Sequence, residues 1–295
     1  MKFITVFTPA YNRAYCIHKL YASLKSQTNQ NFKWLVVDDG STDNTKELID
    51  SWVEEAVLDI EYIYKQNGGM HTAHNIAYQN IDTELNVCID SDDYMPIDAI
   101  DSIFVEWQKV KSDSKAAGMI GLDETTDGTL IGTTFKNEYQ PTSLIDFYQD
   151  QKGSGDKKQV LRSVLTKAYP AYPEYPEERL VPLDTLPTLI CRDYHLIPIN
   201  KVWATVDYQQ GGSSDTIFKQ YFQSPKGFRY AREVNMIESK SLFYKVRNAV
   251  HYGVSTLIIG DLYKILKSPS PLLTLALSPI SWVLYRALQA KVKYK

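Results

Sequence analysis

Short apolar runs alternate with amphipathic segments through the first part of the chain. Four runs rich in branched and aromatic residues predict β-strands, over residues 3–8, 32–38, 60–64 and 84–90. Apolar positions with helical spacing fall between and after these runs, over residues 15–27, 45–55, 71–79 and 96–111. Strands that alternate with helices form a mostly parallel sheet that helices cover on both faces. The pattern therefore predicts an α/β fold.

The later part of the chain has a different pattern. Residues 118–180 are less regular and contain loop-like glycine- and proline-rich segments, and helical spacing returns from Val181. Tyr208–Asp215 predicts a glycine-rich turn before a helix. We expect one domain over residues 1–235, which is regular to about residue 112, and a helical, basic and apolar extension over residues 236–295.

A polar loop follows each of the four predicted strands. The loops have the sequences TPAYNRA, DDGSTD, QNGGMHTAHN and DSDD. Each has an ordinary structural explanation, as a turn, a helix cap, a glycine hinge or a solvated acidic turn. Ligands bind at the carboxyl ends of strands in parallel sheets, so four such loops in succession favour a binding site.

The acidic loop carries the clearest chemistry. Asp90 ends the fourth predicted strand, and Asp92 and Asp93 follow it. Carboxylates held close together repel one another unless a cation joins them, and oxygen ligands suit Mg²⁺ or Mn²⁺. The alternative is a solvated turn that caps the helix beginning near Pro96.

Composition excludes several classes of protein. A formal net charge of −3 gives no general nucleic-acid footprint. The 3 cysteines are scattered, which excludes a clustered zinc site and favours a reducing compartment. The first residues become polar too soon for a signal peptide, so a cytoplasmic location is expected. Neither GxGxxG nor GxxxxGK[ST] follows the first strand, which argues against a dinucleotide-dependent oxidoreductase and a P-loop NTPase.

The segments TPAYNR, VVDDGSTD, NGG…HN and DSDD together resemble glycosyltransferase family 2. This resemblance implies a GT-A fold, with a mostly parallel central sheet, flanking helices and a helical C-terminal extension. It implies a glycosyltransferase of the hexosyltransferase class that uses a nucleoside diphosphate sugar, with UDP as the expected nucleotide, and Mn²⁺ or Mg²⁺. Residues 1–112 would then bind the nucleotide and residues 113–235 the acceptor.

The resemblance also implies roles for individual residues. Those expected at the nucleotide are Thr8, Pro9, Tyr11, Arg13, Asp39, Asn67, Gly68, His74 and Asp90. Asp92 would bind the metal together with Asp90, and Asp93 would assist at the sugar or the metal. Weaker matches near the acceptor or the sugar are Asp156, Lys157 and Glu178.

The family's catalytic base lies on a downstream acidic motif, and the best match is Asp184 in RLVPLDTL. Glu177 and Glu178 precede it as weaker candidates, and the clearer Glu-Asp pair of many members is missing. The alternative is a carboxylate at a helix start that interacts with the helix macrodipole.

The C-terminal tail, residues 262–295, carries six basic residues and no acidic one. Within it, Leu272–Tyr285 is uncharged, but it is shorter than the ~20 residues that span a bilayer. Its basic flanks and aromatic residues suit a segment in the membrane interface, at the inner face of the cell membrane. The alternative is a helix packed on the rest of the protein.

These features predict a metal-dependent, inverting glycosyltransferase that acts on a saccharide or lipid-linked saccharide in surface polysaccharide biosynthesis. One alternative is a catalytically inactive nucleotide-sugar-binding assembly protein. Another is a sugar nucleotidyltransferase, although the N-terminus has no glycine-rich pyrophosphorylase-type signature.

Overall fold

The structure is a computed structural model that describes residues 2–208 and 217–293. Most of the turn expected at Tyr208–Asp215 and the last two residues of the basic tail lie outside this range. The described residues divide into two compact units. The α/β unit comprises Met1–Ala171 and Ile190–Gln209, and the helical unit comprises Tyr172–Leu189 and Gln210–Lys295. The expected domain boundary at residue 235 stays a prediction.

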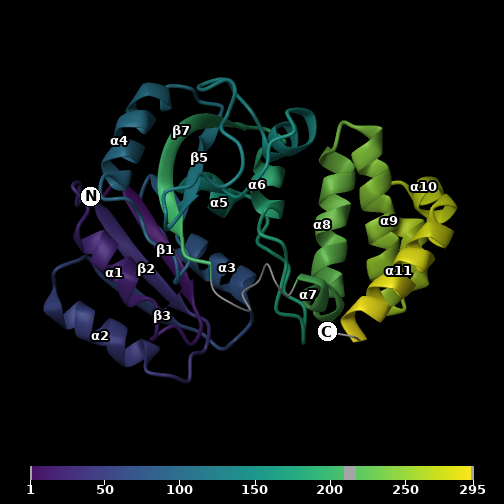
Figure 1. The fold of residues 1–295 in the computed structure, drawn as a ribbon, viewed down its shortest axis with the longest axis horizontal. Coiled ribbons are helices and arrows are strands. Elements are labelled where there is room, and N and C mark those ends of the chain that lie inside the picture. Colours follow the sequence, from purple (N-terminus) through teal and green to yellow (C-terminus); the bar gives the residue numbers. More distant parts are fainter. Residues whose placement is uncertain (1, 209–216, 294–295) are drawn as a thin grey trace. The chain divides into compact units, whose positions relative to one another are not determined.

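A seven-stranded sheet forms the centre of the α/β unit (Figure 1). Its strands are β1 (Ile4–Ala10), β2 (Phe32–Asp38), β3 (Ile60–Tyr64), β4 (Leu85–Cys88), β5 (Ala116–Thr125), β6 (Lys157–Arg162) and β7 (His195–Val206). Their order is β3-β2-β1-β4-β6-β5-β7. Only β6 is antiparallel to its neighbours among these strands. The predicted mostly parallel α/β sheet is confirmed.

Helices cover both faces of this sheet because strand side chains alternate between the faces. The helices of the unit are α1 (His18–Lys25), α2 (Thr45–Glu55), α3 (Met70–Asn80), α4 (Ala99–Val110), η1 (Asp146–Asp150) and α5 (Ser163–Ala168). Val6 of β1 packs in one core cluster with residues of α1, α2 and α4, among them Trp107. Phe7 points to the other face, where it contacts His74 and Tyr78 of α3.

The irregular region expected at residues 118–180 is more ordered than the sequence pattern indicated. It contains most of β5 and all of β6 and α5. The first eight residues of β5 are buried, and a strand buried on both faces has no polar alternation to mark it.

The helical unit contains six helical elements in its described residues. They are α7 (Ile217–Gln223), α8 (Pro225–Glu238), α9 (Leu242–Ile259), η2 (Leu262–Lys267), α10 (Pro271–Ala276) and α11 (Ser278–Lys293), and α6 (Thr185–Ile190) begins in the same unit. α11 packs on α9, where Ser281 Oγ donates to the Val250 carbonyl at 3.0 Å. Gly253 permits this approach, because a Cβ there would lie 2.4 Å from Ser281 Oγ. No helix in the described part of the chain is long and apolar enough to cross a membrane.

Candidate functional site

The carboxyl ends of β1, β2, β3 and β4 lie at one edge of the sheet because these strands are parallel. The loop after β1 is joined to the loop after β2. Asn12, which has a left-handed φ of 53°, accepts hydrogen bonds at Oδ1 from the amides of Thr42 at 2.8 Å and Asp43 at 3.3 Å. The Asn12 amide donates to Ser41 Oγ at 2.8 Å. TPAYNRA and DDGSTD therefore form one continuous surface.

Asp39 organises the loop after β3. Its Oδ1 accepts hydrogen bonds from Lys65 Nζ at 2.6 Å and the Gly68 amide at 2.8 Å, and its Oδ2 accepts one from the Gly69 amide at 2.7 Å. Asn67 Nδ2 donates to the Asp39 carbonyl at 2.8 Å. The structure thus brings together Asp39, Asn67 and Gly68, three of the residues expected at the nucleotide. A contact of Asp39 with a base stays a prediction.

The predicted residues on β1 and its loop differ in exposure. Thr8 is fully buried, and its hydroxyl accepts a hydrogen bond from Trp34 Nε1 at 3.0 Å. Pro9 is also buried. Tyr11 is 48% exposed, and the Arg13 side chain is 33% exposed. Tyr11 and Arg13 are therefore the side chains of this group that a ligand in solvent can reach.

Arg13 and Asp92 bring the loops after β1 and β4 together. Arg13 Nη1 lies 3.9 Å from Asp92 Oδ2 and donates to the Tyr15 hydroxyl at 2.7 Å. The Asp92 side chain is 22% exposed, and Asp90 is half-buried. A cationic and an anionic group thus both reach the site from neighbouring strands.

The acidic loop forms a fixed turn. The Asp93 amide donates to the Asp90 carbonyl at 3.0 Å, and Asp93 Oδ1 accepts the Asp207 amide at 3.1 Å. Burial and, after it, the neighbouring Asp90 together raise the pKa of Asp93 to about 7, although Lys158 opposes the rise. Burial also raises the pKa of Asp90, again against the effect of Lys158. The carboxylates therefore lie in a region short of positive charge.

The donor set of this loop fits a divalent cation. No group of three or more His, Cys, Asp or Glu side chains among residues 2–208 and 217–293 is arranged to hold a metal alone. Mg²⁺ is commonly bound through one or two carboxylates together with substrate phosphates. Asp90 and Asp92, which are both accessible in part, supply two such carboxylates.

Two charged residues of the site were missed by the sequence analysis. Lys158 of β6 lies 4.0 Å from Asp123 of β5, measured from Nζ to Oδ2. Burial lowers the pKa of Lys158, but Asp123, Asp90 and Asp93 outweigh it and leave the pKa raised. The signal in the sequence was a charged residue inside an otherwise apolar run, at Asp123.

His74 lies beneath the end of β4. Its Nε2 is 3.5 Å from Cys88 Sγ, and its Nδ1 is 3.2 Å from the Tyr78 hydroxyl. Burial lowers the pKa of His74 to about 3, so its imidazole is neutral at neutral pH. His74 therefore brings no positive charge to the site.

The two weaker candidates on the loop before β6 have different surroundings. Lys157 is buried, and its Nζ donates to the carbonyls of Ile131 at 2.8 Å, Ser154 at 2.9 Å and Asp156 at 3.0 Å. Asp156 is exposed, and its charge raises the pKa of Asp90. Lys157 thus holds the loop together, while the Asp156 carboxylate faces solvent near the acidic turn.

Asp184 and Glu178 lie in the helical unit. The Glu178 carboxylate accepts hydrogen bonds from the amides of Lys226 and Gly227, each at 2.9 Å, and so caps the start of α8. Asp184 directly precedes α6 and is exposed. Protein packed around it raises the pKa of its carboxyl, against the effect of Arg232.

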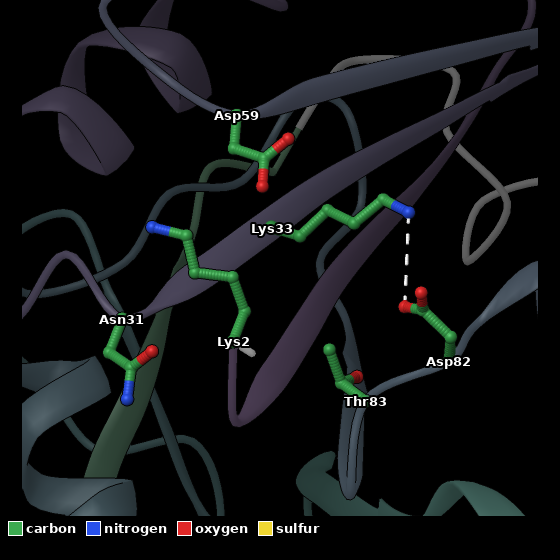
Figure 2. Close-up of a pocket in the computed structure, with 6 residues that line it drawn as sticks. All are labelled: Lys2, Asn31, Lys33, Asp59, Asp82 and Thr83. Carbon is green, nitrogen blue, oxygen red and sulfur yellow. Dashed lines mark ion pairs between the residues drawn. The ribbon is translucent and has the colours of Figure 1, made fainter.

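A polar hollow lies at the opposite, amino-terminal edge of the sheet (Figure 2). It has a volume of about 540 Å³ and is lined by Lys2, Asn31, Lys33, Asp59, Asp82 and Thr83. Lys33 is paired there with Glu61 at 2.5 Å and Asp82 at 3.9 Å. Its charges compensate one another, unlike those at the carboxyl edge.

Comparisons with known proteins identify the family and the fold. The sequence model of glycosyl transferase family 2 matches residues 5–155, and the chain belongs to this family. Glycosyltransferase GlyA of Streptococcus pneumoniae is 29% identical over 124 residues, which are 41% of this chain and 17% of that protein. Teichoic acid poly(glycerol phosphate) polymerase of Staphylococcus epidermidis is 33% identical over 101 residues, which are 34% of this chain and 14% of that protein. The chain thus spans less than a fifth of these curated relatives.

Solved structures share the fold. Residues 1–349 of S. aureus TarS, in complex with UDP-GlcNAc, match with a TM-score of 0.61 at 16% identity, covering 99% of this chain and 92% of that chain. A mannosyltransferase from Pyrobaculum calidifontis, in complex with GDP-Man and Mn²⁺, matches with a TM-score of 0.57 at 16% identity, covering 98% and 83%. The predicted GT-A fold is confirmed.

Proposed function

We propose that this chain is a metal-dependent glycosyltransferase that moves a sugar from a nucleoside diphosphate to a saccharide or lipid-linked saccharide. The observation that carries the proposal is the meeting of Arg13 with Asp92, beside Asp90, at the carboxyl edge of a parallel sheet. UDP is the expected nucleotide. The proposal includes inversion at the anomeric carbon and a role in surface polysaccharide biosynthesis, which family membership and the bacterial relatives support.

Asp90 and Asp92 would hold a Mn²⁺ or Mg²⁺ ion. When bound, such an ion neutralises charge on the leaving diphosphate as a Lewis acid. Arg13, whose guanidinium is always charged, adds a second positive group at the same place. The exposed ring of Tyr11, on the same loop as Arg13, offers an aromatic surface for the nucleotide.

Asp184 is the proposed general base. A base must accept the proton of the acceptor hydroxyl, and a pKa raised toward the working pH makes a carboxylate better suited to this. Protein packed around Asp184 raises its pKa in that direction. In a single displacement the hydroxyl oxygen attacks the anomeric carbon, its proton passes to Asp184, and the nucleoside diphosphate leaves with the bonding electron pair.

A donor screen tests the proposal. The protein is incubated with UDP-, GDP- and dTDP-sugars in Mn²⁺, Mg²⁺ or EDTA, and nucleoside diphosphate release is measured. We expect slow, metal-dependent release from one donor that Asp92→Asn abolishes, and we expect Asp184→Asn to retain binding but lose transfer. Binding of UDP without any turnover would instead indicate the inactive assembly protein. Absence of metal-dependent nucleotide binding would refute the enzyme proposal.

We also propose that the tail contacts the inner face of the cell membrane, because it exposes apolar side chains among basic ones. The exposed apolar residues of the tail are Leu262, Tyr263, Leu266, Leu272, Leu275, Ile280, Trp282 and Val283. On α11, Trp282 and Arg286 lie one turn apart on the exposed side, with the guanidinium 5.9 Å from the indole centroid. Apolar and basic groups on one surface suit anionic lipid headgroups.

Vesicle sedimentation tests the membrane contact. We expect the full chain to sediment with phosphatidylglycerol vesicles and far less with phosphatidylcholine vesicles. The double substitution of Leu272→Asp and Trp282→Asp should abolish sedimentation. Val164→Asp, at a site in α5 that is 67% exposed, is the matched control and should sediment normally. Concentration-dependent self-association without vesicle binding would assign this surface to a second copy of the chain and refute the membrane contact.

A further inference from the structure

Lys158 presents a cationic group at the edge of the sheet where the proposed nucleotide-binding loops meet. β6 is antiparallel, so its first residues lie beside the last residues of β4 and β5. The Lys158 side chain is 14% exposed. Its Nζ makes no hydrogen bond to any residue in the described part of the chain, and its only ion pair there is with Asp123 at 4.0 Å.

Asp123, the acidic member of this ion pair, also has a polar atom without a hydrogen bond to the described residues. Its side chain is 2% exposed, and its Oδ1 has no hydrogen-bond partner among the described residues. A buried ion pair repays its desolvation only when good geometry and further hydrogen bonds satisfy both groups. At 4.0 Å the pair lacks a direct hydrogen bond. The pair is therefore poorly explained by stability alone.

Two other lysines show how the ammonium of a lysine with a structural role is bound in this protein. Lys157 is next in the chain, and its ammonium donates to three carbonyls within 3.0 Å. Lys33, at the opposite edge of the sheet, has its ammonium 2.5 Å from Glu61. Lys158 is as well enclosed as Lys33, at 14% against 19% side-chain exposure, yet none of the described residues gives it a partner at such a distance.

The gap between the two charges fits a hydroxyl group. A hydroxyl oxygen can accept from an ammonium while its hydrogen is donated to a carboxylate. Two such bonds of ordinary length, about 2.8 Å each, bridge groups that are 4.0 Å apart. A phosphate suits the position less well, because Asp90, Asp93 and Asp123 together outweigh the charge of Lys158.

We propose that Lys158 and Asp123 together bind one hydroxyl group of the donor sugar and so help to select that sugar. The proposal rests on the proposed transferase function. It assigns donor discrimination to a pair formed between β5 and β6, outside the nucleotide-binding loops. A site built to hydrogen-bond a substrate hydroxyl discriminates strongly against an analogue that lacks it.

Binding measurements separate the sugar from the nucleotide. Isothermal titration in Mn²⁺ would compare UDP, UDP-glucose, UDP-galactose, UDP-GlcNAc, GDP and GDP-mannose on the full chain. For the best-bound nucleotide sugar, Lys158→Met should weaken binding about tenfold or more, and Asp123→Asn should also weaken it. Binding of the corresponding nucleoside diphosphate should stay within about twofold. Lys33→Met, the control at the opposite edge, should change neither.

Deoxy analogues of the best-bound donor identify the hydroxyl. The analogue that lacks the bound hydroxyl should bind the natural protein about tenfold more weakly. Its penalty should be smaller in Lys158→Met, where only Asp123 still binds the hydroxyl, and should vanish in the double variant Lys158→Met/Asp123→Asn. Circular dichroism and thermal denaturation would show that the variants are folded. Retention of the full penalty in Lys158→Met would overturn the assignment.

Other outcomes are equally decisive. Equal losses for the nucleotide and the nucleotide sugar would place Lys158 at the diphosphate and overturn the sugar assignment, with the transferase proposal intact. Unchanged binding of both would show that the gap holds only water. Failure of the natural protein to bind any nucleotide in Mn²⁺ would refute the transferase function itself, and the sugar assignment with it.

Discussion

Arg13 Nη1 lies 3.9 Å from Asp92 Oδ2, which joins the first and the fourth strand loops across the centre of the sheet edge. Both side chains remain partly exposed, at 33% and 22%. An ion pair of this kind contributes little to folding. Its position, where a diphosphate and its cation would meet, explains it better as part of the binding site.

Arg13→Gln should therefore affect binding more than stability. We expect the free energy of unfolding to fall by less than about 1 kcal/mol, because the pair is partly solvated. Affinity for UDP in Mn²⁺ should fall about tenfold, because a charged donor to the diphosphate is lost. Urea denaturation and isothermal titration measure the two effects. A large loss of stability with unchanged UDP affinity would show that Arg13 is structural.

Asp39→Asn should lower the free energy of unfolding strongly. The carboxylate accepts hydrogen bonds from Lys65, Gly68 and Gly69, and an amide cannot accept all of them. We expect urea denaturation to show a loss of about 2–4 kcal/mol. Asp50→Asn is the control, since the Lys46–Asp50 pair on α2 is exposed and should contribute far less to stability. Equal effects of the two substitutions would contradict the assignment.

Much of the fold could be predicted because its signals are local. The runs that became β1, β2, β3 and β4 were predicted within a few residues, and with them the sheet edge that carries Arg13 and Asp92. The Lys158–Asp123 pair could not be predicted, because chain order does not reveal that β6 lies between β4 and β5. A pairing between distant strands depends on packing rather than on local periodicity.

The tail shows the same limit. The lack of charge over Leu272–Tyr285 indicates one continuous segment, yet the structure divides this stretch between α10 and α11. Apolar periodicity alone could not show which face packs inside the protein. Ser281, a polar residue, is fully buried against α9, while Trp282 is 55% exposed.

Because of His74, the free energy of unfolding should fall as the pH is lowered. Burial lowers its folded pKa to about 3, below the ordinary value of 6.5, so the unfolded chain binds a proton that the folded chain does not. The contribution of the neutral His74 to the free energy of unfolding is complete above pH 6.5 and is lost as the pH falls toward 3. Between pH 7.5 and pH 5 it amounts to about 2 kcal/mol. His74→Gln should flatten the profile by this amount.

The measurement is urea denaturation at several pH values. His251, whose pKa is lowered to about 4 by burial and by nearby arginines, contributes in the same direction from the helical unit. His251→Gln is therefore the companion variant, and each substitution should remove only its own part of the slope. A His74→Gln profile parallel to that of the natural protein would show that the fold does not lower the pKa of His74.

Glu178→Ala should destabilise the helical unit without a direct effect on chemistry. Its carboxylate accepts the amides of Lys226 and Gly227 at the start of α8. Loss of such a cap costs about 1–2 kcal/mol, which urea denaturation would detect. Glu177→Ala, at the exposed neighbour, should change stability by less than about 0.5 kcal/mol. Donor turnover at saturation should be unchanged in both, whereas a fall confined to Glu178→Ala would favour the weaker assignment of Glu178 at the acceptor.

Gly40→Ala tests how closely the loops after β2 and β3 must approach. Gly40 has a φ of 85°, and a Cβ there would lie 2.7 Å from the Asn67 amide nitrogen. Gly128 has a φ of 81°, but among the described residues none other than its two chain neighbours has an atom within 4 Å of an added Cβ, so Gly128→Ala reports the cost of the left-handed backbone alone. We expect that cost to be about 1 kcal/mol, with Gly40→Ala at least about 1 kcal/mol worse because Asn67 must move. UDP affinity should fall only in Gly40→Ala, since Asn67 and Gly68 belong to the proposed nucleotide site. Equal stabilities and unchanged UDP affinity in the two variants would show that the loops have room to separate and that their contact does not shape the site.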